Sequence, residues 1–230
     1  MDALSGLRLR DRAVVLDDLL VLADLHVGKA AAANVQVPVG AGADMVDRVE
    51  TLCEQFDPET VVLAGDLLHS FETVPHLVEE TLDGLRDAID AAGASVVVTP
   101  GNHDTMLDVV WGGVTTPEHR VDDTVVCHGH VEPAADAERY IIGHDHPTIT
   151  IEGHTRPCYL AGDGVYRGAD LLVVPSFNRL VSGVEINEMT AGDFLSPLVQ
   201  NADALAPLVR DTDRDETLGF PPLGEFRHRL

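Results

Sequence analysis

Two stretches decide the fold: residues 60–66 are TVVLAGD and residues 95–104 are SVVVTPGNHD. Each begins with a short apolar run rich in valine, which favours a buried strand. Each run is followed by a glycine and then by polar side chains, Asp66 in the first stretch and residues 102–104 in the second. Residues 74–92, which lie between them, have the apolar spacing of a helix. The two stretches therefore predict a strand–helix–strand unit with polar groups at the carboxyl ends of its strands.

The same arrangement recurs three more times, each time as an apolar strand that ends in aspartate or histidine. These further strand ends are Leu19–Ala23 before Asp24-Leu25-His26, Thr124–Cys127 before His128-Gly129-His130, and Tyr140–Ile142 before Gly143-His144-Asp145-His146. In open α/β sheets, ligands bind outside the carboxyl ends of the strands. One such motif alone is no more than a turn with polar residues. Five in order predict a single rim that gathers Asp, His and Asn.

The order of elements predicts an α/β protein with two sheets. Ala13–Leu16 and Leu19–Ala23 flank Asp17-Asp18 and predict a hairpin, and Met45–Phe56 predicts a helix. Later apolar runs at 148–151, 171–174 and 184–187 make the second half mostly β. One layer of parallel strands and one of mixed strands, each covered by helices, fits this order.

Helix ends and domain limits follow from the same pattern. The helix predicted over Val74–Ala92 has Thr73 as its expected N-cap and Pro75 in its first turn. We expect a single domain over residues 1–200. Residues 201–230 are polar and charged, and we expect a C-terminal hairpin or tail there.

The charge of the chain is strongly acidic. Fifteen basic and 39 acidic residues among 230 leave a net charge of −24. Such a chain repels polyanions, which argues against nucleic-acid binding. Acid excess with a single lysine also fits a protein from a very salty cytoplasm, where about 1 M salt reduces the screening length to about 3 Å. We favour the halophile interpretation over an acidic mesophilic protein, and under it the charge does not decide the substrate.

The cysteines and the N-terminus predict a cytoplasmic protein. Cys53, Cys127 and Cys158 are odd in number and widely spaced, so reduced thiols are expected rather than a disulfide framework. The N-terminal residues do not form a signal peptide, and no apolar run approaches the roughly 20 residues of a spanning helix. We expect no membrane partner.

Carboxylate, amide and imidazole groups at the predicted rim indicate a site for divalent metals. Mixed oxygen and imidazole ligands suit manganese, iron or zinc. No cysteine belongs to the set, which disfavours a thiolate zinc site. The glycines before Asp66, Asn102 and His144 allow sharp turns and close approach of the backbone.

The ordered motifs D-x-H, G-D, G-N-H-D, H and G-H-x-H resemble those of the calcineurin-like metallophosphoesterase superfamily. Two further stretches, LADLHVGKAAAANVQVP at 22–38 and LLVVPSFNRLVSG at 171–183, resemble the small ICC-like phosphoesterases. That group includes the ligase-associated DNA-damage-response endonucleases. The resemblance covers roughly residues 13–187, and it implies a four-layer α/β/β/α sandwich with two metals at its rim.

The resemblance also implies a set of ligands, in which Asp66 bridges the two metals. One metal would take Asp24, His26, Asp66 and His146, and the other would take Asp66, Asn102, His128 and His144. Manganese is the expected ion, with iron or zinc as alternatives. Two cations about 3.5–4 Å apart would activate a shared water for attack on phosphorus and neutralise the phosphate oxygens.

Other polar residues near the motifs have weaker assignments. His103 is the expected proton donor to the leaving group, and Asp104 is expected to orient its imidazole or stabilise its charge. His69 either holds a ligand or the phosphate, or packs at a helix start. His130 either orients His128 or contacts substrate, or is a surface residue. Lys29, the only lysine, either contacts phosphate or is simply solvated.

The leading hypothesis is therefore a phosphodiesterase or nuclease that acts on DNA or RNA, with a repair protein as a further partner. Hydrolysis of small phosphate compounds, such as cyclic nucleotides or phosphomonoesters, uses the same metal core and stays open. A metal-binding scaffold without turnover is the third hypothesis, and the complete ligand set argues against it.

Overall fold

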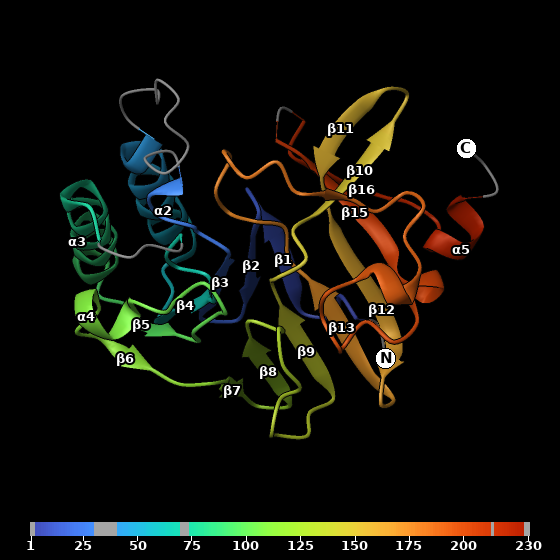
Figure 1. Ribbon diagram of the computed structural model, residues 1–230, viewed down its shortest axis with the longest axis horizontal. Coiled ribbons are helices and arrows are strands. Elements are labelled where there is room, and N and C mark those ends of the chain that lie inside the picture. The colour runs from blue at the N-terminus through green and yellow to red at the C-terminus, as the bar shows by residue number, and fades with distance from the viewer. Residues whose placement is uncertain (1–2, 30–40, 70–73, 213, 228–230) are drawn as a thin grey trace.

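The computed structural model describes residues 3–29, 41–69, 74–212 and 214–227 (Figure 1). Its first sheet has six strands in sequence order: β1 (Leu7–Arg10), β2 (Ala13–Leu16), β3 (Leu19–Ala23), β4 (Thr60–Ala64), β5 (Ser95–Val98) and β6 (Val114–Thr115). Strands β3 to β6 are parallel, and β1 and β2 extend the sheet as antiparallel strands. The predicted hairpin and the predicted parallel layer are thereby confirmed.

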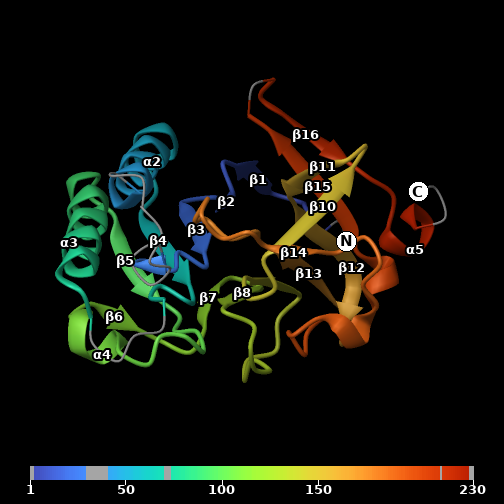
Figure 2. The ribbon, with the colours of Figure 1, turned by 45° about the horizontal axis from the view of Figure 1, so that its top comes forward.

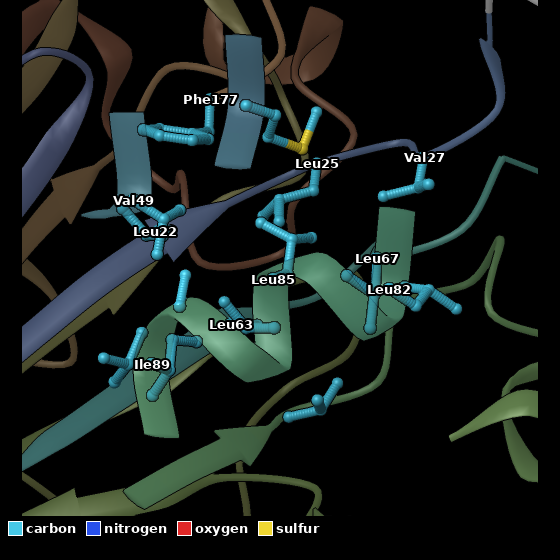
Figure 3. Close-up of a cluster of buried hydrophobic side chains, with 14 of the residues drawn as sticks. Leu22, Leu25, Val27, Val49, Leu63, Leu67, Leu82, Leu85, Ile89 and Phe177 are labelled. Carbon is cyan, nitrogen blue, oxygen red and sulfur yellow. The ribbon is translucent and has the colours of Figure 1, made fainter. Parts of the chain in front are cut away.

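Two helices cover one face of this sheet, as Figures 1 and 2 show. They are α2 (Ala41–Phe56) and α3 (His76–Ala91). Helix α3 begins two residues later than predicted, because Pro75 has extended backbone angles and occupies the N-cap. Thr73, the expected N-cap, lies outside the described residues. Figure 3 shows the apolar cluster between helices and sheet, in which Leu85 of α3 and Leu63 of β4 take part.

The second sheet contains seven strands in the order β16-β15-β12-β13-β9-β8-β7. Their bounds are β7 (His119–Val121), β8 (Thr124–Cys127), β9 (Arg139–Ile142), β12 (Tyr159–Tyr166), β13 (Ala169–Val173), β15 (Ala206–Asp211) and β16 (Glu216–Gly219). Strands β8, β9 and β13 are parallel and their neighbours are antiparallel, so the predicted mixed layer is confirmed. A small third sheet holds β10 (Pro147–Ile151), β11 (His154–Pro157) and β14 (Val184–Glu185).

Alternation along the strands explains why the two large sheets lie face to face. On β4, Val61 and Leu63 belong to the cluster under the helices, whereas Val62 and Ala64 belong to a cluster between the sheets. Successive side chains of a strand point to opposite faces, so a strand that is apolar throughout must be covered on both sides. Ile141 of β9 joins the same cluster between the sheets.

The outer face of the second sheet is covered mainly by short helical turns and loops. These are the 3-10 helices η1 (Ala191–Asp193) and η2 (Ala202–Ala204) and helix α5 (Leu223–Phe226), while α4 (Leu107–Val110) lies near β6. Residues near the C-terminus are part of this region. Strand β15 pairs with β12, and Phe226 packs in the apolar cluster on the outer face of the second sheet. Among the described residues, no helix combines the length and apolar character needed to cross a bilayer. The layers agree with the predicted α/β/β/α class, with a fourth layer that has little helix.

Candidate metal centre

The polar strand ends of both sheets meet at one rim. Asp24 follows β3, Asp66 follows β4 and Asn102 follows β5 in the first sheet. His128 follows β8, and the segment from His144 to His146 follows β9 in the second sheet. Within each sheet these strands are parallel neighbours, so their carboxyl ends lie on the same edge. All five predicted motifs therefore reach the same part of the molecule.

The side chains form two groups that share Asp66. In the first, ligand atoms of Asp24, His26, Asp66 and His146 all lie within 4.8 Å of one another. In the second, atoms of Asp66, His128 and His144 satisfy the same limit. Asn102 adjoins the second group, with its Oδ1 3.1 Å from Nε2 of His128. The structure thus brings together the seven residues that the sequence assigned to metal binding.

The first group has the features of a site built for a cation. Nε2 of His26 and Nε2 of His146 lie 3.2 Å apart, and Nε2 of His146 is 3.3 Å from Oδ1 of Asp24. Oδ1 of Asp24 and Nδ1 of His26 are buried without a hydrogen-bond partner among the described atoms. A buried carboxylate oxygen left unpaired is costly. A cation among these atoms would satisfy the Asp24 oxygen, so the residues fit a bound metal.

Glycines allow the ligands to approach so closely. A Cβ at position 65 would lie 2.2 Å from Nδ1 of His128, and one at position 101 would lie 2.1 Å from Oδ1 of Asp66. A Cβ at position 143 would lie 2.5 Å from Oδ2 of Asp24. Any larger residue at these three positions would displace a group of the candidate centre, which gives the predicted close approach a physical cause.

Five of the seven candidate ligands have left-handed backbone angles. Asp24, His26, Asp66, His144 and His146 all have positive φ angles, between 41° and 74°. Residues other than glycine rarely adopt this region, and such strain is typical of functional sites. A hydrogen bond of ordinary length holds one of these turns: the backbone N–H of His144 donates to Oδ2 of Asp24 at 2.9 Å.

Burial sets the protonation of the metal-free centre. It raises the pKa of Asp66 to about 7, with the charges of Asp24 and Asp104 adding to the effect. Burial lowers the pKa of His26 to about 3 and that of His144 to about 4. These two imidazoles are therefore neutral at pH 7 and have a nitrogen lone pair for a metal. Two adjacent buried carboxylates, by contrast, need positive charge to stay ionised together.

Two polar residues outside the ligand set support the Asp24-Leu25-His26 turn by hydrogen bonds, and the sequence did not predict their roles. The hydroxyl of Ser176 donates to the Asp24 carbonyl at 2.7 Å, and Nδ2 of Asn178 donates to the Leu25 carbonyl at 2.8 Å. Both belong to the stretch 171–183, whose resemblance to the ICC-like group was the available signal. Asp145 was also missed, although it lies between two predicted ligands. Its carboxylate accepts a hydrogen bond from the Leu195 backbone at 2.7 Å.

Asp104 is buried and binds backbone. Its carboxylate accepts hydrogen bonds from the backbone N–H groups of Leu67, Leu68 and Gly101, at 3.2, 2.8 and 2.8 Å. It thereby ties the G-N-H-D loop to the turn that follows Asp66. The predicted effect of Asp104 on the His103 imidazole stays a prediction.

The remaining predicted residues surround the two groups. The His103 side chain is 39% exposed, and its Nε2 lies 4.0 Å from Oδ2 of Asp66. The ring of His69 stacks on that of His103 with centroids 6.2 Å apart, and the ring of His130 lies 5.1 Å from that of His128. The charge of Lys29 contributes to the lowered pKa values of His26 and His69, after the larger effect of burial. All four thus border the centre.

Comparison with known proteins agrees with this architecture. The family model for calcineurin-like phosphoesterases matches residues 18–183. A crystal structure of a Pseudomonas putida nuclease, MPE, superposes with a TM-score of 0.59 at 22% sequence identity. That match covers 86% of this chain and 88% of the other, and at this identity it supports the fold alone. The comparison with curated proteins finds no match.

Proposed function

Since the match over residues 18–183 makes the chain a member of the calcineurin-like phosphoesterase family, we propose that it is a two-metal phosphodiesterase that cleaves nucleic acid. The observation that supports this most directly is the pair of ligand groups joined by Asp66. A centre with two metals suits phosphodiester hydrolysis, in which both the attacking and the leaving oxygen carry charge.

Asp24, His26, Asp66 and His146 would hold one cation, and Asp66, Asn102, His128 and His144 would hold the other. When bound, such a pair supplies a water of lowered pKa and neutralises the phosphate oxygens. The chain's own contribution is to keep the ligands in place. Turns strained at five of these residues and the hydrogen bonds of Ser176 and Asn178 fix the geometry before substrate arrives.

We assign to His103 the protonation of the leaving oxygen. Its backbone N–H donates to Oδ1 of Asp66 at 2.9 Å, which holds the residue beside the centre. Its side chain is the part that stays open to solvent, so it can meet a substrate group that approaches from outside. We assign Lys29 to phosphate contact, and its positive charge lowers the pKa values of His26 and His69.

Nucleic acid is proposed as the substrate because two indications agree. The motifs of residues 22–38 and 171–183 resemble the ICC-like group, and the similar solved structure is that of a nuclease. A role in DNA repair with a repair protein as partner would follow from this group. The net charge of −24 favours the second candidate, hydrolysis of small phosphate compounds, because it repels long polyanions at low salt.

Manganese is proposed for both positions, because oxygen and imidazole ligands surround them and no cysteine takes part. Cys53, Cys127 and Cys158 are all free and buried, which is consistent with the cytoplasmic location that we propose. The acid excess leads us to propose a halophilic source and to assay the protein in concentrated salt.

A substrate panel tests the proposal. The metal-loaded protein would be given a bis-aryl phosphodiester, an aryl phosphomonoester and single-stranded DNA, each with Mn²⁺, Fe²⁺ or Zn²⁺ at several salt concentrations. We expect Mn²⁺-dependent cleavage of the diester and of DNA, and much weaker cleavage of the monoester. Preference for the monoester with no cleavage of DNA would support the small-substrate alternative, and no turnover under any condition would support a scaffold.

A further inference from the structure

A polar cavity lies near the candidate metal centre. Its volume is about 260 Å³, somewhat less than the roughly 300–1,000 Å³ that is usual for drug-sized ligands, so it fits a small group. The turn between β1 and β2, the end of β11, the end of β15 and the segment around Pro175 line it. Figures 1 and 2 show β15, a strand of the second sheet, beside the β10–β11 hairpin.

The cavity is rich in arginine although the protein is acidic. Arg12, Arg156, Arg179 and Arg210 line it, which is four of the fourteen arginines in a chain of net charge −24. Asp11 is the acidic residue in the lining. Arg179 pairs with Asp11 and Asp44, and Arg210 pairs with Asp215, so the guanidinium groups available to attract an anion are those of Arg12 and Arg156.

Two of the four arginines, Arg12 and Arg156, have no carboxylate ion pair among the described residues. Arg12 donates to the backbone carbonyls of Ser176 and Asn178, both at 3.2 Å, rather than to a side-chain carboxylate. Burial, together with the nearby charges of Arg48 and Arg179, lowers the pKa of Arg12 to about 10. Arg156 is exposed and has no ion pair with any residue in the described part of the chain. An anion in the cavity would relieve this repulsion.

The cavity and the metal centre share one wall. Pro175 lines the cavity, and the next residue, Ser176, donates its hydroxyl to the carbonyl of the candidate ligand Asp24. Arg12 binds the carbonyl oxygens of this same segment from the cavity side. The segment that contains Pro175 and Ser176 therefore lies between a ligand in the cavity and the Asp24-Leu25-His26 turn.

We propose that this cavity binds a phosphate group other than the one that is cleaved. Arginine pairs with phosphate through two parallel hydrogen bonds, and phosphate is a small anion that matches the size and charge of the space. The group belongs either to the same nucleic-acid strand or to a free phosphate compound. Its assignment to a strand rests on the proposed function, whereas phosphate binding itself does not.

Arg156 is the residue to change, because it is exposed on β11 and its side chain has no hydrogen bond or ion pair with the described residues. Arg156→Ala and Arg156→Glu would be compared with Arg167→Ala and Arg167→Glu. Arg167 is also exposed, pairs with Glu132 and lies at the opposite end of β12 from the cavity. Thermal melting of each full-length, metal-loaded variant confirms that it is folded.

The first measurement is calorimetric titration with inorganic phosphate. Phosphate that binds at the metals contributes equally in both series, so the difference reports the cavity. We expect Arg156→Ala to weaken the cavity-dependent binding about tenfold, with a larger loss in Arg156→Glu and wild-type behaviour in the Arg167 variants. Equal phosphate binding in all variants would overturn the proposal, whatever the enzyme cleaves.

The second measurement identifies the source of the phosphate. The kcat/KM for single-stranded DNA is measured over a series of KCl concentrations. If the cavity holds a strand phosphate, the salt slope of Arg156→Ala decreases by about 0.7, the value for one contact with a single strand. An unchanged slope together with weaker phosphate binding assigns the cavity to a free phosphate compound. Absence of DNA cleavage in the wild type would refute the proposed nuclease function but not the phosphate cavity.

Discussion

Replacement of Gly101 by alanine is a sharp test of the packing at the metal centre. A Cβ at this position would lie 2.1 Å from Oδ1 of Asp66 and 2.4 Å from its backbone nitrogen. An ordinary van der Waals contact begins at 3.4 Å, so either Asp66 or the loop must move by about 1.3 Å. Asp66 is the residue shared by both ligand groups, so the movement disturbs both metals at once.

A displacement of about 1 Å at a reacting centre costs about 100-fold in rate. We therefore expect Gly101→Ala to lose about 100-fold in kcat/KM for a bis-aryl phosphodiester, and to bind Mn²⁺ more weakly. The assays are Mn²⁺-dependent hydrolysis and calorimetric titration with Mn²⁺, with circular dichroism to confirm folding.

Gly112→Ala is the matched control. A Cβ at position 112 meets no atom within 4 Å, and neither glycine has a positive φ that would itself penalise alanine. The control is expected to keep wild-type turnover and metal affinity. Wild-type activity and Mn²⁺ affinity in Gly101→Ala would refute the close approach on which the geometry of the centre depends.

Three further changes probe different parts of the site. His103→Asn is expected to lower kcat about 100-fold or more while Mn²⁺ affinity stays unchanged, and undiminished turnover would remove His103 as the proton donor. Burial raises the pKa of Asp66 to about 7, and Asp66 must be ionised to bind metal. Below pH 7, Mn²⁺ affinity should therefore fall about tenfold per pH unit for each proton that the metal displaces. Equal Mn²⁺ affinity at pH 6 and pH 8 would contradict this. Asp104→Ala leaves three backbone N–H groups without their acceptor, so the free energy of unfolding should decrease by about 3 kcal/mol. Tm should then fall by roughly 6–12 °C. Asp108→Ala, a change at an exposed position, should melt like the wild type.

The positions of the candidate ligands at the rim could be predicted because these residues come shortly after apolar strands in the sequence. β4 ends at Ala64 and β8 ends at Cys127, and a candidate ligand, Asp66 or His128, follows each within two positions. Strand direction then determines where these side chains go, and no knowledge of distant contacts is needed. The helix and strand bounds near the motifs differ from expectation by only a few residues for the same reason.

Strand β12 shows what local patterns do not reveal. Residues 159–166 are YLAGDGVY, and the Gly-Asp-Gly in the middle suggests a turn rather than a strand. The structure keeps the strand continuous through a register shift between Gly162 and Tyr166, next to β13. Pairing with a neighbour outweighs local propensity here.

The hydrogen bonds that support the metal centre could not be predicted from local sequence patterns either. Asn178 reaches the Leu25 carbonyl across 153 positions of the chain, and Ser176 reaches Asp24 across 152. Serine and asparagine are common in loops, so apart from the resemblance of residues 171–183 to the ICC-like group nothing in their local context indicates such a contact. The arginine cavity likewise combines residues from positions 12 to 210, which only the packing of the two sheets brings together.

Anomalous diffraction from crystals grown with Mn²⁺ would test the two-metal centre most directly. We predict two manganese peaks about 3.5–4 Å apart, both in contact with the Asp66 carboxylate, one beside His26 and His146 and the other beside His128 and His144. A single peak, or peaks that Asp66 does not join, would contradict the account.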